Sequence, residues 1–228
     1  MARDNQIIYD AEQEEKERFD EFVSSLLLGL ASVSSIDSFA TYRRIAERRI
    51  DKYMKGYEGR LKDSIRKGVE SISKKLATDE YIDQAFKNIY KIKGTNNTIT
   101  LKEILERAGY RIKGDLTTET LRTIGFDTPS QNNIASIRKA MLKKNQNSLA
   151  QTLGNEMHKA REQAKIDKVV EIDKRGEKEK VFYYNTQNDD NVRTWHAALQ
   201  GEMTIAEAQE ARNTTMSEIN CRCYLTEI

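Results

Sequence analysis

The side chains best suited to chemistry lie near the C-terminal end, where Cys221 and Cys223 follow His196. The chain has no other cysteine, and its second histidine is His158. On a strand, Cys221 and Cys223 would point to the same side, so docking that strand on the His196 segment would bring one imidazole and two thiols together. Imidazole nitrogen and cysteine sulfur are soft ligands that suit zinc, and zinc prefers four ligands. Asp190, His158 or a partner chain would have to supply the fourth.

A structural role for the same residues is the interpretation that the sequence favours. Buried cysteines behave as small hydrophobic side chains, and His196 would then make a hydrogen bond in the core. One C-x-C pair with one histidine is a weaker zinc signature than paired C-x-x-C knuckles. We therefore expect no cofactor, with zinc on His196, Cys221 and Cys223 as the alternative.

A catalytic role needs more than this sequence offers. A Cys221 or Cys223 nucleophile with His196 as base is available. However, both cysteines lie on a predicted strand within eight residues of the last residue, which leaves little chain for an oxyanion hole or a cleft. The sequence also lacks a P-loop, a G-x-S-x-G and an H-E-x-x-H motif. We expect that the protein is not an enzyme, with a thiol- or metal-dependent effector enzyme as an alternative.

The elements that would position these residues form a small α+β module. Segments 168–173 and 180–186 are rich in β-branched and aromatic residues and predict a β-hairpin. A short helix over 190–200 and a last strand over 223–228 follow. The helix is expected to place three apolar residues on one face, with the tryptophan as core anchor, and to stop at a glycine: Val192, Trp195, Leu199 and Gly201.

The clearest periodicity lies before this module, over residues 39–76, where apolar side chains recur every three or four residues. That pattern predicts a long amphipathic helix. Gly56, Gly59 and Gly68 are expected to split or bend it. Three tyrosines lie on its apolar stripe and are expected to pack in a core rather than to stack on bases: Tyr42, Tyr53 and Tyr57.

Further helices are predicted over residues 7–31 and 79–93. Thr100 and Glu103 predict a capping box, T-x-x-E, at the start of another helix, which Gly109 is expected to end. A short helix over 118–124 is expected to end at Gly125.

The next helix should start at Thr128-Pro129, with Thr128 as N-cap and Pro129 in the first turn. Asn145–Asn147 is expected to interrupt it. The fold class is therefore mainly α with a small C-terminal α+β module: long amphipathic helices, then a β-hairpin, a short helix and a final strand. We expect a helical region over 1–125, a helical hairpin over 126–166 and the module over 167–228.

Charge is distributed unevenly along the 228 residues, although the net charge is only +2. Residues 41–75 hold twelve bases and five acids, a net charge of +7. A solvated helix face explains this as well as a contact with DNA or an acidic partner does. The candidate contact residues are Arg43, Arg44, Arg48, Arg49, Lys52 and Lys55.

Two classes of protein are disfavoured by the sequence. No run of about 18 apolar residues exists, so we expect no membrane span and no membrane partner. The apolar stretch Val23–Val33 follows acidic rather than basic residues, which argues against a secretion signal. Cysteines one residue apart rarely form a structural disulfide, so the chain suits a reducing cytosol.

The C-terminal motifs together resemble a known family. The segment Asp189–Gly201 has the pattern D-x-x-V-R-x-x-H-x-x-L-x-G, and Asn220-Cys221-Arg222-Cys223 follows about twenty residues later. This combination, over about residues 145–228, resembles the Mu F-like domain of phage head-morphogenesis proteins. Glu202–Glu218 departs from the family, because it lacks the proline and the extra histidine that members often carry there, and 205–212 predicts a helix instead. The resemblance gives the motif residues a structural role: Asp190, Val192, Arg193, Trp195, Leu199, Gly201 and Asn220.

The resemblance implies a minor head protein of a tailed bacteriophage, which docks at or near the portal and assists head assembly or DNA packaging and delivery. It would lie in the virion head in multiple copies, and in the host cytoplasm during assembly. The portal protein is the expected partner, with the major capsid protein, the scaffold protein and DNA as further candidates. A DNA-binding protein that acts on the phage genome is the alternative function.

Overall fold

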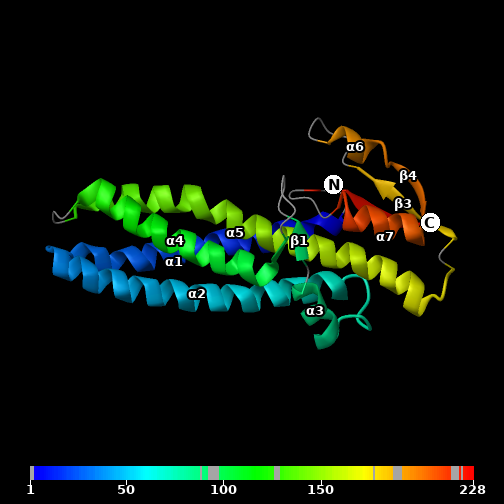
Figure 1. The fold of residues 1–228 in the computed structure, drawn as a ribbon, viewed down its shortest axis with the longest axis horizontal. Coiled ribbons are helices and arrows are strands. Elements are labelled where there is room, and N and C mark those ends of the chain that lie inside the picture. Colours follow the sequence, from blue (N-terminus) through cyan, green and yellow to red (C-terminus); the bar gives the residue numbers. More distant parts are fainter. Residues whose placement is uncertain are drawn as a thin grey trace. The chain divides into compact units, whose positions relative to one another are not determined.

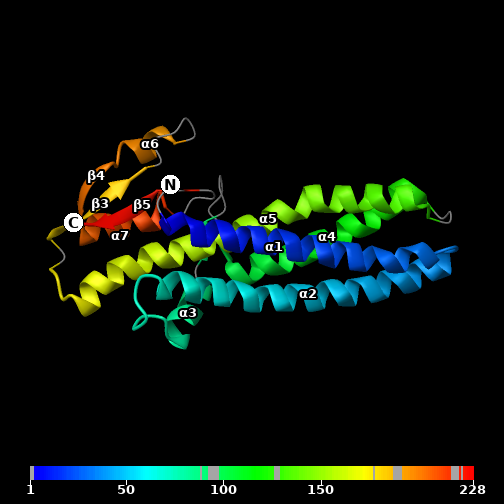
Figure 2. The same cartoon turned by 180° about the vertical axis from the view of Figure 1, so that it is seen from behind.

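The computed structural model describes residues 3–87, 89–91, 98–125, 129–176, 178–186, 192–216, 221 and 223–228. Helices dominate it, and the strands are short (Figures 1 and 2). The helices are α1 (Arg3–Leu27), the 3-10 helix η1 (Leu28–Ser32), α2 (Ile36–Glu70), α3 (Asp79–Phe86), α4 (Leu101–Ile124), α5 (Gln131–Asp167), the π-helix η2 (Lys168–Ile172), α6 (Thr194–Ala197) and α7 (Ile205–Asn213). The strands are β1 (Ile89–Lys91), β2 (Thr98–Thr100), β3 (Lys180–Asn185), β4 (Gly201–Thr204) and β5 (Tyr224–Glu227).

The chain divides into two compact units. Unit 1 comprises Met1–Leu61 and Phe86–Thr152, and unit 2 comprises Lys62–Ala85 and Leu153–Ile228. The helices α2 and α5 each contribute residues to both units. The division reflects only which residues pack compactly together. It does not test the domain boundaries that the sequence predicts near residues 125 and 166, and these stay predictions. No helix among the described residues is long and apolar enough to cross a membrane.

Unit 1 is a bundle in which α1 and α4 lie alongside the unit's parts of α2 and α5 (Figures 1 and 2). The predicted stripe on α2 faces this core, with Ile50 and Tyr57 fully buried. The Tyr57 hydroxyl donates a hydrogen bond to the carbonyl of Leu149 at 2.7 Å. The tyrosines on the stripe therefore pack, as predicted.

A buried carboxylate forms an ion pair inside the bundle, and we call its site the Glu15 centre (Glu15, Tyr53 and Arg60). Glu15 is 2% exposed and accepts hydrogen bonds from Arg60 Nε at 2.8 Å and Arg60 Nη2 at 2.9 Å. The Tyr53 hydroxyl donates to the same carboxylate. The negative charge of Glu15 is therefore matched by a cation on another helix.

Two predicted helix breaks in unit 1 are wrong. α4 runs through Gly109, which is buried, and a side chain there would meet Met54 Cγ at 3.4 Å. α5 runs through Asn145, whose side chain accepts a hydrogen bond from Arg111 and donates to Asp115. Asparagine breaks helices when it bonds to its own local backbone, and here α4 supplies the principal partners.

The ends of these helices are closer to prediction. Thr100 and Glu103 form the predicted capping box of α4, and Gly125, with φ of 62°, follows its last residue. Thr128 lies outside the described residues. The predicted helix start at Pro129 is wrong, because α5 begins at Gln131 and is capped by Ser130, whose hydroxyl accepts from the backbone N–H of Asn133. The predicted helix over 79–93 is too long, because β1 (Ile89–Lys91) pairs antiparallel with β2 in that stretch.

The long helix α2 is also different from its prediction, because it continues unbroken through all three of its glycines and ends at Glu70. Gly68 shows why a glycine is needed at one position of this helix. A Cβ built on Gly68 would lie 3.0 Å from Met157 Cγ and 3.1 Å from the Met157 carbonyl oxygen. The glycine therefore permits close approach of the two helices within unit 2 rather than a bend.

Unit 2 holds a three-stranded antiparallel sheet in the order β4-β3-β5. In the register, Phe182 pairs with Met203, and Tyr184 pairs with Leu225. Phe182 and Tyr184 are fully buried in a core that also includes Val169. The sheet confirms a small α+β module at the end of a mainly helical chain.

The hairpin predicted from 168–173 and 180–186 is wrong. Lys168–Ile172 continues α5 as a π-helix, and β3 pairs instead with β4 and β5. β-Branched residues favour strands only weakly, and burial of Val169 against the sheet decides the structure here. The predicted helix over 205–212 is confirmed as α7, with a capping box of Thr204 and Glu207.

Candidate functional site

Unit 2 brings His196, Cys221 and Cys223 together, and we call them the cysteine–histidine cluster. His196 Nδ1 lies 3.2 Å from Cys223 Sγ and 3.5 Å from Cys221 Sγ. The three ligand atoms all lie within 4.8 Å of one another. The residues are 2%, 7% and 4% exposed, respectively. Side chains 25 and 27 residues apart therefore converge in a nearly dry site.

The position of His196 follows from the short helix α6. Arg193 precedes it in extended conformation, and the single helical turn then directs His196 inward. The neighbouring Trp195 is 56% exposed, so the prediction that it anchors the core is wrong. A helix of four residues has room for one inward side chain, and His196 takes that place. Leu199, just beyond the turn, packs against the core as predicted.

The thiols are positioned by β5 and by α5. The strand β5 starts directly after Cys223 and pairs with β3. His158 Nε2 is 2.9 Å from the Cys223 carbonyl oxygen, and Glu162 accepts the backbone N–H of Leu225 at 2.8 Å. Both side chains are buried. They lie one turn apart on α5 and hold the backbone that carries the thiols.

From the sequence, His158 is one candidate for the fourth zinc ligand, and the structure places it in a different role. His158 is not a member of the cluster, because its Nε2 contacts the Cys223 backbone. Glu162 was missed altogether. The signal that could have found it is the i, i+4 spacing of two polar residues, His158 and Glu162, beside the apolar positions of α5.

The neighbours of Cys223 favour its thiolate form. A hydrogen bond from the Cys221 thiol lowers the pKa of Cys223 to about 5, against the opposing effect of burial. Hydrogen bonds from the Tyr184 hydroxyl and His196 act in the same direction. The pKa of Cys221 is raised, first by its hydrogen bond to Cys223 and then by burial. The site therefore favours the thiolate form at Cys223 and the thiol form at Cys221.

The remaining motif residues surround the cluster or lie outside the described residues. Val192 and Arg193 are half-buried before α6, and the positive charge of Arg193 offsets a small part of the rise in the pKa of Cys221. Gly201 starts β4 with φ of 152°, a conformation that favours glycine. Asp190 and Asn220 belong to the undescribed part, so their predicted structural roles stay predictions.

Residues 117–226 match the family described as phage Mu protein F-like protein. This part of the chain is similar to the phage Mu F-like family. The Mu F-like region thus includes the end of α4, all of α5 and the whole cysteine–histidine cluster, and it starts earlier than the resemblance recognised from motifs. No curated protein and no solved structure is significantly similar to the chain.

The match to this family indicates a phage head-morphogenesis protein. Such proteins are structural, which is consistent with the expectation that the chain is not an enzyme.

Outside the Mu F-like region, the six basic candidates on α2 separate into two groups. Arg43 pairs with Glu47 at 2.8 Å, and Arg49 donates to the carbonyl of Ser25 at 3.0 Å and to its hydroxyl. The others are exposed on successive turns of one face, and among the described residues they have no ion pair. We call them the α2 basic stripe: Arg44, Arg48, Lys52 and Lys55.

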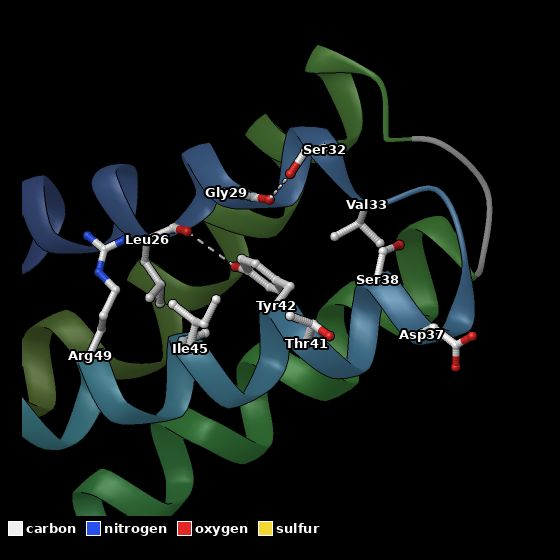
Figure 3. Close-up of a pocket in the computed structure, with 11 residues that line it drawn as sticks. Leu26, Gly29, Ser32, Val33, Asp37, Ser38, Thr41, Tyr42, Ile45 and Arg49 are labelled. Atoms are coloured by element: carbon white, nitrogen blue, oxygen red, sulfur yellow. Dashed lines mark hydrogen bonds between the residues drawn. The ribbon is translucent and has the colours of Figure 1, made fainter.

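A hollow of about 460 Å³ lies where η1 joins α1 to α2, also outside the Mu F-like region (Figure 3). Leu26, Val33 and Ile45 contribute apolar lining, and the Tyr42 hydroxyl donates to the Leu26 carbonyl at 3.3 Å. We call this site the bundle-end hollow. Its wall residue Ile45 is 53% exposed, and Leu28 at 76% is the most exposed large apolar side chain of the described residues.

Proposed function

We propose that the protein is a minor head protein of a tailed bacteriophage, which docks at or near the portal and assists head assembly or DNA packaging and delivery. The observation that carries this proposal is the Mu F-like match over residues 117–226. The protein would be part of the virion head in multiple copies and would pass through the host cytoplasm during assembly. The portal protein is the proposed partner, with the major capsid or scaffold protein as further contacts.

Burial of the cysteine–histidine cluster supports a structural rather than a catalytic role. None of its three residues is more than 7% exposed, so a substrate would have no direct access to the thiols. A general base or nucleophile must lie within hydrogen-bond reach of the reacting group. Recognition of other head proteins therefore has to use other surfaces of the chain.

The bundle-end hollow is the surface that we propose for the portal contact. Three exposed apolar residues lie on or beside the α1–α2 connection: Leu28 at 76%, Ile36 at 61% and Ile45 at 53% exposure. Exposed apolar residues that gather beside a hollow favour contact with another protein. Ile45 both lines the hollow and is exposed, which makes it the residue to test.

Particles and the portal protein provide the test. Mass spectrometry of purified phage particles should detect the chain, and a density map should place it at the portal vertex. Ile45→Asp should reduce co-purification with the portal protein, because a charge would be buried in an apolar contact. Tyr110→Asp is the matched control, since Tyr110 is 72% exposed on α4 and does not line this hollow. Absence of the chain from particles would refute the proposal.

A DNA-binding role is the second candidate, because the α2 basic stripe gives it a defined surface. Four cations on one helix face can neutralise phosphates and release counterions. Four such contacts predict a slope of about −3.6 for log K against log salt on duplex DNA. Replacing the stripe by glutamine should abolish that slope. The charge-neutral double change Arg43→Gln with Glu47→Gln, on the same helix, should leave it unchanged.

A further inference from the structure

We infer that His196, Cys221 and Cys223 form a zinc site that fastens the segment before β5 to α6. The proposal concerns the folding of unit 2 and does not depend on the proposed role in the phage head. Its basis is the convergence of one imidazole nitrogen and two sulfurs within 4.8 Å.

The distances match a tetrahedral zinc centre. With Zn–N near 2.0–2.1 Å and Zn–S near 2.3 Å, tetrahedral angles separate nitrogen from sulfur by about 3.6 Å. The two observed separations from His196 Nδ1 are 3.2 Å to Cys223 and 3.5 Å to Cys221. A metal ion could therefore enter with shifts of a few tenths of an ångström. The described residues supply three of the four ligands that zinc prefers.

The environment of the thiols also suits a cation. Zinc binds cysteine sulfur as the thiolate, which is the form that both Cys221 and Cys223 would adopt in the site. The Cys221 thiol lies in the same site and would lose its proton to water as the Zn–S bond forms. Burial of all three side chains adds to the case, since a buried thiolate is expensive unless a positive charge compensates it.

Two side chains of α5 hold the backbone that carries the cysteine ligands. His158 contacts the carbonyl oxygen of Cys223 at 2.9 Å, and Glu162 accepts the Leu225 N–H at 2.8 Å. Such outer contacts fix the orientation of ligands and tune metal affinity. Both come from α5, so the thiol-bearing segment is held from behind by a long helix.

The local structure of unit 2 explains why a metal would be useful there. α6 has only four residues, and isolated helices of that length are unstable in water. Cys221 and Cys223 lie outside regular secondary structure, just before β5. A bond from His196 to these cysteines would close a loop that contains β4 and α7, which restricts the unfolded chain more than the folded one.

Metal content and stability of the purified full chain test the inference. The reduced protein should contain about one zinc per chain, as tetrahedral sites of this type do. Removal of the metal by a chelator should lower the melting temperature, and added Zn²⁺ should restore it. Co²⁺ should give the absorption bands of a tetrahedral site with thiolate ligands. Failure of the reduced, folded chain to bind Zn²⁺ or Co²⁺ would overturn the inference.

Variants separate a metal site from a merely packed one. Loss of a ligand should weaken zinc binding by more than the roughly 10–100-fold seen when a residue that only supports a ligand is changed. The three variants that remove a ligand are His196→Ala, Cys221→Ser and Cys223→Ser. His196→Cys should retain binding, because it replaces one soft ligand by another. Trp195→Phe is the control, since Trp195 lies beside His196 but is exposed. Equal zinc binding by all of these variants would exclude the site.

Discussion

Two buried polar sites, one in each unit, are built in opposite ways. In unit 1, the Glu15 centre places one carboxylate against one guanidinium and one hydroxyl, so that opposite charges match. In unit 2, the cysteine–histidine cluster brings together three groups that can all donate electron pairs to a metal. The bundle therefore completes its buried polar site with its own side chains, whereas the module gathers ligands that are suited to an added cation.

The largest effect in the bundle is expected on removing one half of its ion pair. Glu15→Ala should lower the free energy of unfolding by about 2 kcal/mol, because it leaves the half-buried Arg60 without its carboxylate and the Tyr53 hydroxyl without its acceptor. Urea unfolding of unit 1 would measure it. Glu47→Ala, which removes the exposed partner of Arg43, is the control and should cost about 0.5 kcal/mol or less. If Glu15→Ala and Glu47→Ala lowered the free energy of unfolding by similar amounts, the Glu15 centre would contribute no more to stability than an exposed ion pair.

Replacing both members of the pair sharpens the same comparison. Glu15→Leu combined with Arg60→Leu should cost less than Glu15→Ala alone, because no uncompensated charge remains. The corresponding replacement of all three cluster residues by apolar ones should abolish zinc binding. If the double variant were less stable than Glu15→Ala, the attraction between Glu15 and Arg60 would itself stabilise the bundle. The absence of an uncompensated charge would then not be enough to maintain stability.

A smaller effect is expected from glycines in the two units. Gly68→Ala in unit 2 should destabilise the protein by about 1–2 kcal/mol, because its Cβ would press on Met157. Gly59→Ala in unit 1 should stabilise it by up to about 1 kcal/mol, since no atom lies within 4 Å of the new Cβ. Thermal unfolding of the two variants would compare them. A stabilising Gly68→Ala would refute the close helix approach in unit 2.

The smallest effects are expected at the two capping boxes. Thr100→Ala and Thr204→Ala should each cost about 1 kcal/mol, because each removes an acceptor for an N-terminal backbone N–H. Hydrogen exchange should show faster exchange in the first turn of α4 and of α7, respectively. Thr→Ser at either position keeps the acceptor and is the control. Unchanged exchange in α7 would show that its packing, not its cap, fixes that start.

The helical stripes and several helix ends could be predicted from the sequence. The apolar period on α2, the Thr100–Glu103 box and the last strand all depend on local spacing, which the sequence states directly. The C-x-C alternation also indicated that Cys221 and Cys223 would face the same way. Local patterns predict well where tertiary contacts agree with them.

The errors arose where a tertiary partner overruled a local preference. Asn145 found partners on α4, so it did not break α5. Val169 found the sheet core, so its segment became a π-helix instead of a strand. His196 rather than Trp195 occupies the inward-facing position of α6, and Trp195 is exposed. None of these partners is visible without the fold, which is why His158 and Glu162 also escaped notice as supports of the site.

The central place of β3 in its sheet bears on how copies of the chain behave when crowded. Among the described residues, the sheet ends at β4 on one side and at β5 on the other, and each has only four residues. An unpaired strand edge is a template for another chain, and short edges limit that pairing. Short sheet edges would therefore limit strand-by-strand association between the multiple copies that the proposed function places in one virion head.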